Sequence, residues 1–223
     1  MKGNKITILS KDSQKEIEYT HIQTGSTSIC FMLSGTGYSY DKPLFYYATM
    51  AMLENNMDVV HIHYSYEKEL FEHSFEDITA ILMNDVDAVM NNVLDSSSYN
   101  ETIFLAKSLG TISVIGDIMK REVFNKSKMI LLTPLLKLEE IYKDLLKSNH
   151  EGLIVIGDKD PHYNLEQVEQ IKKQTTFKME VIHGANHSLD DEEVDTLTSI
   201  SSLMKVIENL KEMLQVNDLI MKK

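Results

Sequence analysis

Apolar and polar positions form alternating blocks along most of the chain. Short apolar runs alternate from residue 28 onward with longer segments in which apolar residues recur every three or four positions. The short runs predict β-strands at residues 28–33, 57–64, 102–107, 128–133, 152–157 and 178–183. Before them, "KITIL" and "KEIEYTHI" predict an antiparallel pair of strands, joined by the polar turn "SKDSQ" at residues 10–14.

The segments between these strands have the period of amphipathic helices. They predict helices at residues 41–55, 75–94, 137–148, 164–174 and 192–215, and a further helix that begins at Leu109. In the second of these, one inward stripe is formed by Ile78, Leu82, Val86 and Val89 or Val93. We expect Asp41 to cap the first helix, with Pro43 tolerated in its first turn.

Strands that alternate with helices, and that are apolar almost throughout, indicate a mainly parallel sheet covered by helices on both faces. No repeat, low-complexity tract or linker interrupts the pattern, so residues 1–223 are expected to form a single α/β domain. In an open sheet of this kind, ligands bind outside the carboxyl ends of the strands. The residues that directly follow each strand are therefore the candidates for a functional site.

Amino-acid composition and net charge argue against membrane and nucleic-acid partners. The 223 residues are 43% apolar, but no apolar run approaches the length of a membrane span, and the N-terminus lacks an apolar signal region, which favours a cytoplasmic protein without a membrane partner. A formal net charge of −12 without a basic stripe argues against a nucleic-acid partner. The one cysteine, Cys30, lies within "SICFML" and is expected to be a buried structural thiol. Nothing in the sequence indicates an oligomeric state.

Three residues with complementary chemistry each follow a predicted strand. Ser108 lies in "AKSLG" after the strand at 102–107, Asp160 lies in "GDKDP" after 152–157, and His187 lies in "GANHSL" after 178–183. The first motif differs by one methyl group from the G-x-S-x-G nucleophile elbow, in which a strand turns sharply into a helix. A nucleophile, an acid and a base at three strand ends, in this order, favour a serine hydrolase.

These motifs resemble the α/β-hydrolase family over nearly the whole chain, and "FMLSGTGYS" is similar to that family's oxyanion loop. Among its members, the chain is most similar in outline to small lidless ones such as dienelactone hydrolases and bacterial carboxylesterases. The resemblance implies the α/β-hydrolase fold with an N-terminal antiparallel hairpin and no cap domain. Two positions depart from the family pattern: Ala106 replaces the first glycine of the elbow, and Ser34 stands where many members have histidine.

The resemblance also implies roles for the residues. His187 would take the proton of the Ser108 hydroxyl while Asp160 orients the imidazole, and an acyl-enzyme would form and be hydrolysed. The backbone N–H groups of Leu109 and Thr36 would form the oxyanion hole. Substrate contacts are expected from Gly35, Gly37 and Tyr38. The expected substrate is a small carboxylic ester or thioester, with neither a metal nor another cofactor.

Several alternatives stay open at the level of sequence. Asp158 competes with Asp160 as the acid, His183 competes with His187 as the base, and Ser108 is also a plausible helix N-cap. His61 and His63 would share one side of a strand, and we expect a hydrogen-bonded pair there rather than a metal site. A hydrolase-fold protein that binds or regulates with little turnover is one alternative function. A nucleotide-binding domain is another, although the chain lacks a glycine-rich phosphate loop.

Overall fold

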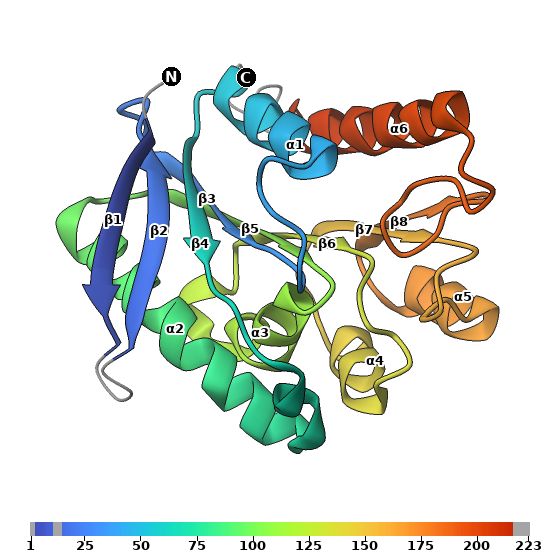
Figure 1. Ribbon diagram of the computed structural model, residues 1–223, viewed down its shortest axis with the longest axis horizontal. Coiled ribbons are helices and arrows are strands. Elements are labelled where there is room, and N and C mark those ends of the chain that lie inside the picture. Colours follow the sequence, from blue (N-terminus) through green and yellow to red (C-terminus); the bar gives the residue numbers. More distant parts are fainter. Residues whose placement is uncertain (1–2, 11–14, 216–223) are drawn as a thin grey trace.

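The computed structural model of the protein describes residues 3–10 and 15–215. An eight-stranded sheet runs through its centre, in the order β1-β2-β4-β3-β5-β6-β7-β8 (Figure 1). The strands are β1 Gly3–Leu9, β2 Glu16–Ile22, β3 Ser28–Leu33, β4 Asp58–His63, β5 Glu101–Lys107, β6 Lys128–Leu132, β7 Gly152–Gly157 and β8 Phe177–Ile182. β2 pairs antiparallel with both β1 and β4, and the other neighbours are parallel.

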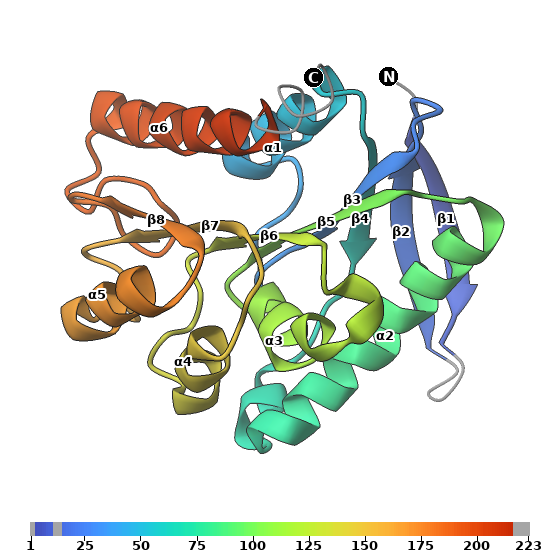
Figure 2. The same cartoon turned by 180° about the vertical axis from the view of Figure 1, so that it is seen from behind.

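Helices cover both faces of this sheet. They are α1 Pro43–Glu54, α2 Phe75–Ser96, α3 Gly110–Gly116, α4 Glu139–Leu146, α5 Leu165–Gln174 and α6 Thr196–Gln215, with short 3₁₀ helices at Lys68–Glu72, Ile118–Lys120 and Glu122–Phe124. α1 and α6 lie side by side on one face and α2 to α5 lie on the other, as the front and back views show (Figures 1 and 2). Among the described residues, no helix has the length and apolar character needed to cross a membrane.

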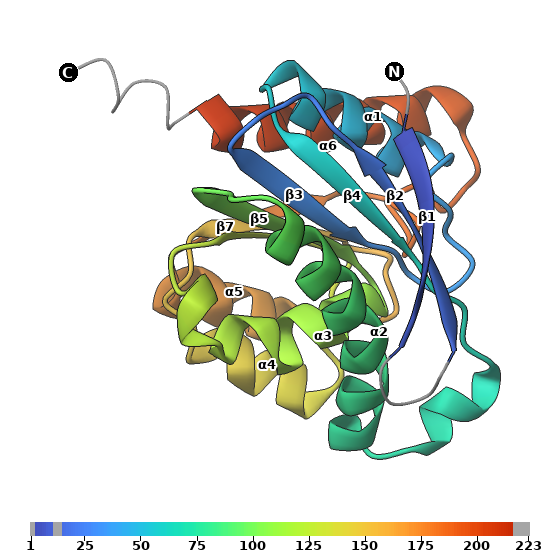
Figure 3. The ribbon, with the colours of Figure 1, turned by 90° about the vertical axis from the view of Figure 1, so that its left-hand side faces the viewer.

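The sheet divides the apolar core into two parts. The side view shows the two helical layers that cover these parts, one on each side of the sheet (Figure 3). On β5, Phe104 packs with the residues of α2 and α3, whereas Ile103 and Leu105 pack with those of α1 and α6. The central strands are therefore buried on both faces, which explains their continuous apolar sequences. Cys30 is fully buried in the part beneath α1, as expected.

The strand and helix predictions are confirmed in outline, including the antiparallel hairpin and the inward stripe of α2. The predicted turn at residues 10–14 lies almost entirely outside the described residues. The predicted Asp41 cap is wrong, because Pro43 is the first helical residue and Lys42 therefore occupies the N-cap position, without a side-chain hydrogen bond.

The last helix also begins later than predicted, at Thr196 rather than at residue 192. The carboxylate of Asp191 accepts hydrogen bonds from the amides of Glu193 and Asp195 and so folds this segment into a turn. Val194 within the turn has a φ of 65°, which a helix does not allow. Local side-chain bonding to the backbone thus delays the helix by one turn.

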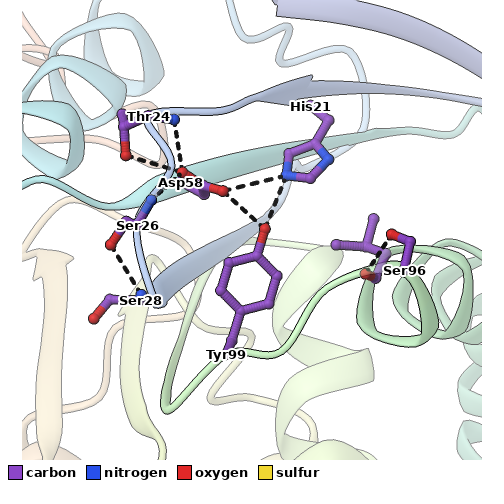
Figure 4. Close-up of polar contacts among 8 residues, drawn as sticks. His21, Thr24, Ser26, Ser28, Asp58, Ser96 and Tyr99 are labelled. Atoms are coloured by element: carbon purple, nitrogen blue, oxygen red, sulfur yellow. Dashed lines mark hydrogen bonds and ion pairs between the residues drawn. The ribbon is translucent and has the colours of Figure 1, made fainter.

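A buried carboxylate, Asp58, organises the edge of the sheet where β4 begins (Figure 4). It accepts hydrogen bonds from the amide and the hydroxyl of Thr24, at 2.7 and 2.9 Å, and from the hydroxyl of Tyr99 at 2.8 Å. Nε2 of His21 lies 3.8 Å from the same carboxylate. Burial alone would raise the pKa of Asp58, but the hydrogen bonds from Thr24, Tyr99 and Ser26 outweigh it and lower the pKa.

Replacing Asp58 with Asn should lower the free energy of unfolding by about 2–4 kcal/mol, because an amide nitrogen cannot accept the hydrogen bonds that the carboxylate accepts. The lowered pKa in the folded state stabilises the protein above the pKa of the unfolded chain, and this stabilisation is lost as the pH falls through the folded value. The deficit measured by urea unfolding should therefore be complete at pH 7 and shrink toward pH 3. Asp41→Asn is the matched control, because Asp41 is exposed and caps no helix; an equal deficit there would contradict the assignment.

Candidate active site

The turn from β5 into α3 places Ser108 at the carboxyl edge of the sheet. Ser108 has a φ of 50°, in the left-handed region that residues other than glycine rarely adopt, and its amide donates to the carbonyl of Leu132 at 3.0 Å. The turn is tight because α3 lies directly against β3. A Cβ atom on Gly110 would lie 2.4 Å from the carbonyl oxygen of Leu33, so only glycine fits there without displacement.

Ala106, which departs from the elbow pattern, is accommodated inside the sheet. It is fully buried and lies in register between Leu33 of β3 and Leu131 of β6. The strand pairing continues through this position to Lys107, and the turn follows with Ser108 in the left-handed conformation. The additional methyl group is therefore compatible with the elbow geometry.

The structure brings Ser108, His187 and Asp160 together in a line of hydrogen bonds. The hydroxyl oxygen of Ser108 lies 2.8 Å from Nε2 of His187, and Nδ1 of His187 lies 2.7 Å from a carboxylate oxygen of Asp160. An ionised carboxylate can only accept, so Nδ1 carries the proton and donates it. Nε2 is then free to accept the hydroxyl proton of Ser108. This is the tautomer that a general base for a serine nucleophile requires.

Asp160 is buried and held by a second donor. Its side chain is fully inaccessible to solvent, and the amide of His162 donates to it at 2.8 Å. Burial favours the neutral acid, but the hydrogen bonds from His187 and His162 outweigh burial and lower the pKa of Asp160. The carboxylate therefore stays charged opposite His187.

The ring of His162 packs near that of His187, with centroids 5.5 Å apart. Its position just after Pro161 predicts no more than a surface role for His162, whereas in the structure it is half-buried and lies beside His187.

The rival acid and base form a separate pair. Nδ1 of His183 lies 2.6 Å from the carboxylate of Asp158, which also accepts the amide hydrogen of Gly184 at 2.8 Å. The side chain of His183 is 94% exposed, so this pair lies on the surface and joins two loops. Ser108 does not act as a side-chain cap, because Leu109 occupies the N-cap position of α3 without a capping bond. The contacts with Ser108 thus favour Asp160 and His187.

The loop after β3 passes directly over Ser108. The amide of Tyr38 donates to the carbonyl of Gly35, which closes a turn that has Gly37 at a φ of 65°. A Cβ atom on Gly35 would lie 2.9 Å from Cβ and 3.5 Å from the hydroxyl oxygen of Ser108. Within the described part of the chain, the amides of Thr36 and Leu109 have no acceptor. Two unpaired backbone donors are thus present in the segments that flank the serine.

Two tyrosines hold this loop, and both contact the backbone of Ser34. The amide of Ser34 donates to the hydroxyl of Tyr40 at 3.1 Å, and the hydroxyl of Tyr64 donates to the carbonyl of Ser34 at 2.7 Å. The ring of Tyr40 stacks on His61, with centroids 4.2 Å apart. The loop is therefore supported by aromatic side chains although Ser34 replaces the histidine of many family members.

The two histidines of β4 each bind a threonine hydroxyl. His61 lies 2.8 Å from Thr49, and His63 lies 2.8 Å from Thr20. Burial lowers the pKa of His61 to about 4, with a smaller contribution from His63, so its ring is neutral. No group of three metal-ligating side chains occurs within residues 3–10 and 15–215.

A cavity of about 520 Å³ opens beside the loop that passes over Ser108, and Ser108, His187 and Asp160 themselves are not among its lining residues. The three residues expected to contact substrate, Gly35, Gly37 and Tyr38, all line it, together with Tyr64 and Ser65 from the segment after β4. A second cavity of about 420 Å³ is lined by Tyr38, by Ser188 and Leu189 of the loop after His187, and by residues at the start of α6. Tyr38 thus lines both cavities.

Residues 27–215 match the family model described as "Alpha/beta hydrolase domain". The chain belongs to this family. A search of curated proteins found no match.

Similar solved structures share the fold at low sequence identity. Est1E from Butyrivibrio proteoclasticus has a TM-score of 0.69 at 14% identity, and the match covers 93% of this chain and 97% of that chain. A serine hydrolase without a lid from Xanthomonas campestris has a TM-score of 0.67 at 11% identity, with 96% and 94% covered. A dienelactone hydrolase from Anabaena variabilis has a TM-score of 0.64 at 15% identity, with 95% and 99% covered. The predicted lidless α/β-hydrolase fold is confirmed.

Substitutions at the two small residues of the elbow should have different effects. Gly110→Ala should lower the free energy of unfolding by more than about 2 kcal/mol and slow the labelling of Ser108 by a fluorophosphonate, because its Cβ meets the backbone of Leu33. Ala106→Gly should cost about 1 kcal/mol through backbone freedom and leave the labelling rate near that of the wild type. Urea unfolding and labelling kinetics measure both. Faster labelling of the Ala106→Gly protein would show that the methyl group displaces the serine.

Proposed function

We propose that this protein is a serine hydrolase that cleaves small carboxylic esters or thioesters through an acyl-enzyme. The observation that carries the proposal is the continuous line of hydrogen bonds from Ser108 through His187 to Asp160. A serine hydroxyl is a weak nucleophile until an adjacent base removes its proton. His187 has an acceptor nitrogen at hydrogen-bond distance from that hydroxyl, and Asp160 orients the ring.

The reaction would proceed in two halves. As the oxygen of Ser108 attacks the substrate carbonyl, its proton passes to Nε2 of His187, which then gives it to the leaving alcohol or thiol. A water molecule next gives its proton to His187 and attacks the acyl-enzyme, and the proton returns to Ser108 when the acid departs. Asp160 stays ionised throughout and stabilises the imidazolium that forms in each half.

The oxyanion of each tetrahedral intermediate needs donors that are already in place. We assign this role to the backbone N–H groups of Leu109 and Thr36, which are unpaired and lie in the segments flanking Ser108. The N–H of the residue after the nucleophile serves this purpose in nucleophile elbows, and the second donor comes from the loop after the third strand. Gly35 permits the close approach of that loop, since any side chain there would collide with Ser108.

The cavity beside the loop supports a small substrate. Its volume of about 520 Å³ falls within the range of small-molecule sites, and Gly35, which lies against Ser108, lines it together with Tyr38 and Tyr64. Charged residues, among them Glu18 and Asp85, line its other side. No cap domain covers it within residues 3–10 and 15–215, and esters or thioesters that reach the serine from solvent are the proposed substrate class.

Labelling by a fluorophosphonate tests the proposed nucleophile directly. The wild-type protein should be labelled at Ser108, and the Ser108→Ala protein should not be labelled although it folds. Absence of labelling in the wild type under native conditions would contradict the proposal and favour a binding or regulatory role.

Asn substitutions at the two competing carboxylates test the proposed acid. Asp160→Asn should lower kcat for a short-chain nitrophenyl ester by about 10³–10⁴-fold, because His187 loses the acceptor that fixes its tautomer. Asp158→Asn is the matched control, since Asp158 contacts the exposed His183, and should stay within about threefold of the wild type. A larger loss in Asp158→Asn than in Asp160→Asn would reverse the assignment.

Adding a methyl group at Gly35 tests the proposed oxyanion loop. Gly35→Ala should lower kcat by about 100-fold, the usual loss on removing one oxyanion donor, because the loop carrying Thr36 must move away from Ser108. Gly25→Ala is the control: Gly25 has a φ of 82°, so alanine strains its loop and lowers stability, but its Cβ would meet no neighbour within 4 Å and it precedes β3, so kcat of the folded protein should be unchanged. Equal kcat values in the two variants would remove Thr36 from the proposed mechanism.

A further inference from the structure

Lys107, the residue directly before Ser108, buries its charge beneath the site. Only 2% of its surface is exposed, which is rare for lysine unless the ammonium group is paired. Its Nζ donates to the main-chain carbonyl of His187 at 2.6 Å and to the hydroxyl of Thr133 at 2.9 Å. The ring of Tyr38 lies on a third side, with Nζ 4.9 Å from its centroid. The charge is thus met by neutral acceptors and an aromatic face.

These contacts join Lys107, His187 and Ser108 in a closed ring of covalent and hydrogen bonds. Lys107 and Ser108 are consecutive, so their backbones move together. The side chain of Ser108 meets the ring of His187, while the side chain of Lys107 holds the carbonyl of the same histidine. Thr133, which follows β6, is fully buried and has a φ of 46°. Its hydrogen bond from Lys107 links this ring of contacts to the strand beside β5. The loop that carries His187 is therefore fixed from both its ring and its backbone.

We propose that Lys107 is a positioning residue, which holds the main chain of His187 and thereby sets the imidazole against Ser108. This inference rests on the proposed function. Lys107 is not assigned any contact with substrate; it acts through His187. The loop that carries His187 connects β8 to α6, and no other lysine or arginine among the described residues binds the His187 carbonyl.

The charge on Lys107 makes this restraint sensitive to pH. Burial lowers the pKa of Lys107 to about 8, the nearby charges of Asp160 and Asp190 oppose that shift, and Lys42 adds to it. Burial raises the pKa of Tyr38, which faces the same group, to about 12, so its ring stays neutral through this range. A charged donor forms hydrogen bonds roughly twice as strong as those of a neutral amine. The restraint on His187 should therefore weaken as the pH rises through about 8.

Stability should respond to pH in the opposite direction to activity. The pKa of Lys107 is lower in the folded protein than in the unfolded chain, so between the two values the unfolded state binds more protons. Stability then rises with pH across that interval. A purely structural lysine would make activity follow the amount of folded protein, whereas a positioning lysine makes activity fall while stability rises.

The test compares Lys107→Met with Lys42→Met. Lys42 is the matched control, since its Nζ also lies over the Tyr38 ring, at 4.6 Å, but makes no bond to His187. Lys107→Met should lower kcat for a short-chain nitrophenyl ester by about 10–100-fold with KM within about threefold, and slow fluorophosphonate labelling to the same extent. The wild type should lose activity above pH 8. Lys42→Met should keep this decline but at a higher pH, because the charge of Lys42 no longer lowers the pKa of Lys107, and Lys107→Met should show no decline.

The other possible results distinguish failure of the positioning role from failure of the proposed function. If the wild type is labelled at Ser108 but Lys107→Met keeps its kcat and its alkaline decline, the positioning role is overturned while the proposed function stands. If the wild type is not labelled, the proposed function itself fails. If Lys107→Met does not fold, Thr133→Val takes its place: loss of one acceptor should shift the alkaline decline to lower pH, and an unshifted decline overturns the inference.

Discussion

The close contact between α3 and β3 is the constraint on which the site depends. Gly110 lies so near the carbonyl of Leu33 that a single added carbon would not fit, and this approach forces the chain to reverse sharply after β5. The reversal holds Ser108 in a left-handed conformation and directs its hydroxyl away from the sheet toward His187. Backbone strain at such a position persists only when the surrounding packing maintains it. Here the two halves of the apolar core provide that packing.

Around this turn, two buried charges of opposite sign flank His187. Asp160 binds the ring nitrogen, and Lys107 binds the main-chain carbonyl of the same residue. Each charge is stabilised by local donors or acceptors rather than by a direct ion pair with the other. Burying a charged side chain lowers the stability of the folded protein. Such a side chain is explained most easily where it fixes the position of a segment that apolar packing would leave free to move. The histidine loop, which lies outside the sheet, is such a place.

The opposite edge of the sheet shows that similar side chains need not form a reactive site. His21, Asp58 and Tyr99 lie together there, but Tyr99 donates directly to Asp58, and the carboxylate is occupied by Thr24 and Ser26 as well. Burial lowers the pKa of His21 and keeps its ring neutral. The donors around Asp58 join loops, whereas at the carboxyl edge the hydroxyl of Ser108 meets a ring nitrogen of His187, and the amides of Thr36 and Leu109 have no acceptor among the described residues. The difference lies in which hydrogen bonds are left available.

Local sequence determined the elements and the positions of the candidate residues. Hydrophobic periodicity predicted the strands and helices, and turn chemistry placed Ser108, Asp160 and His187 after three strands, because these signals depend on neighbours a few residues apart. Periodicity says nothing of what a turn residue bonds to. The Asp41 cap and the start of α6 were predicted wrongly for this reason, since Pro43 and the Asp191 carboxylate decided them.

Only the tertiary structure chose among the candidates. Asp158 and Asp160 share one turn, and His183 and His187 share one loop, so only the approach of β7, β8 and β5 across the sheet could pair each histidine with its carboxylate. The burial of Lys107 was equally beyond sequence analysis, because lysine is usually exposed. Its environment is built from Tyr38, Thr133 and His187, which come from three distant segments. Periodicity is a local property of the chain, whereas the distance between side chains on different strands is set by how the whole sheet assembles.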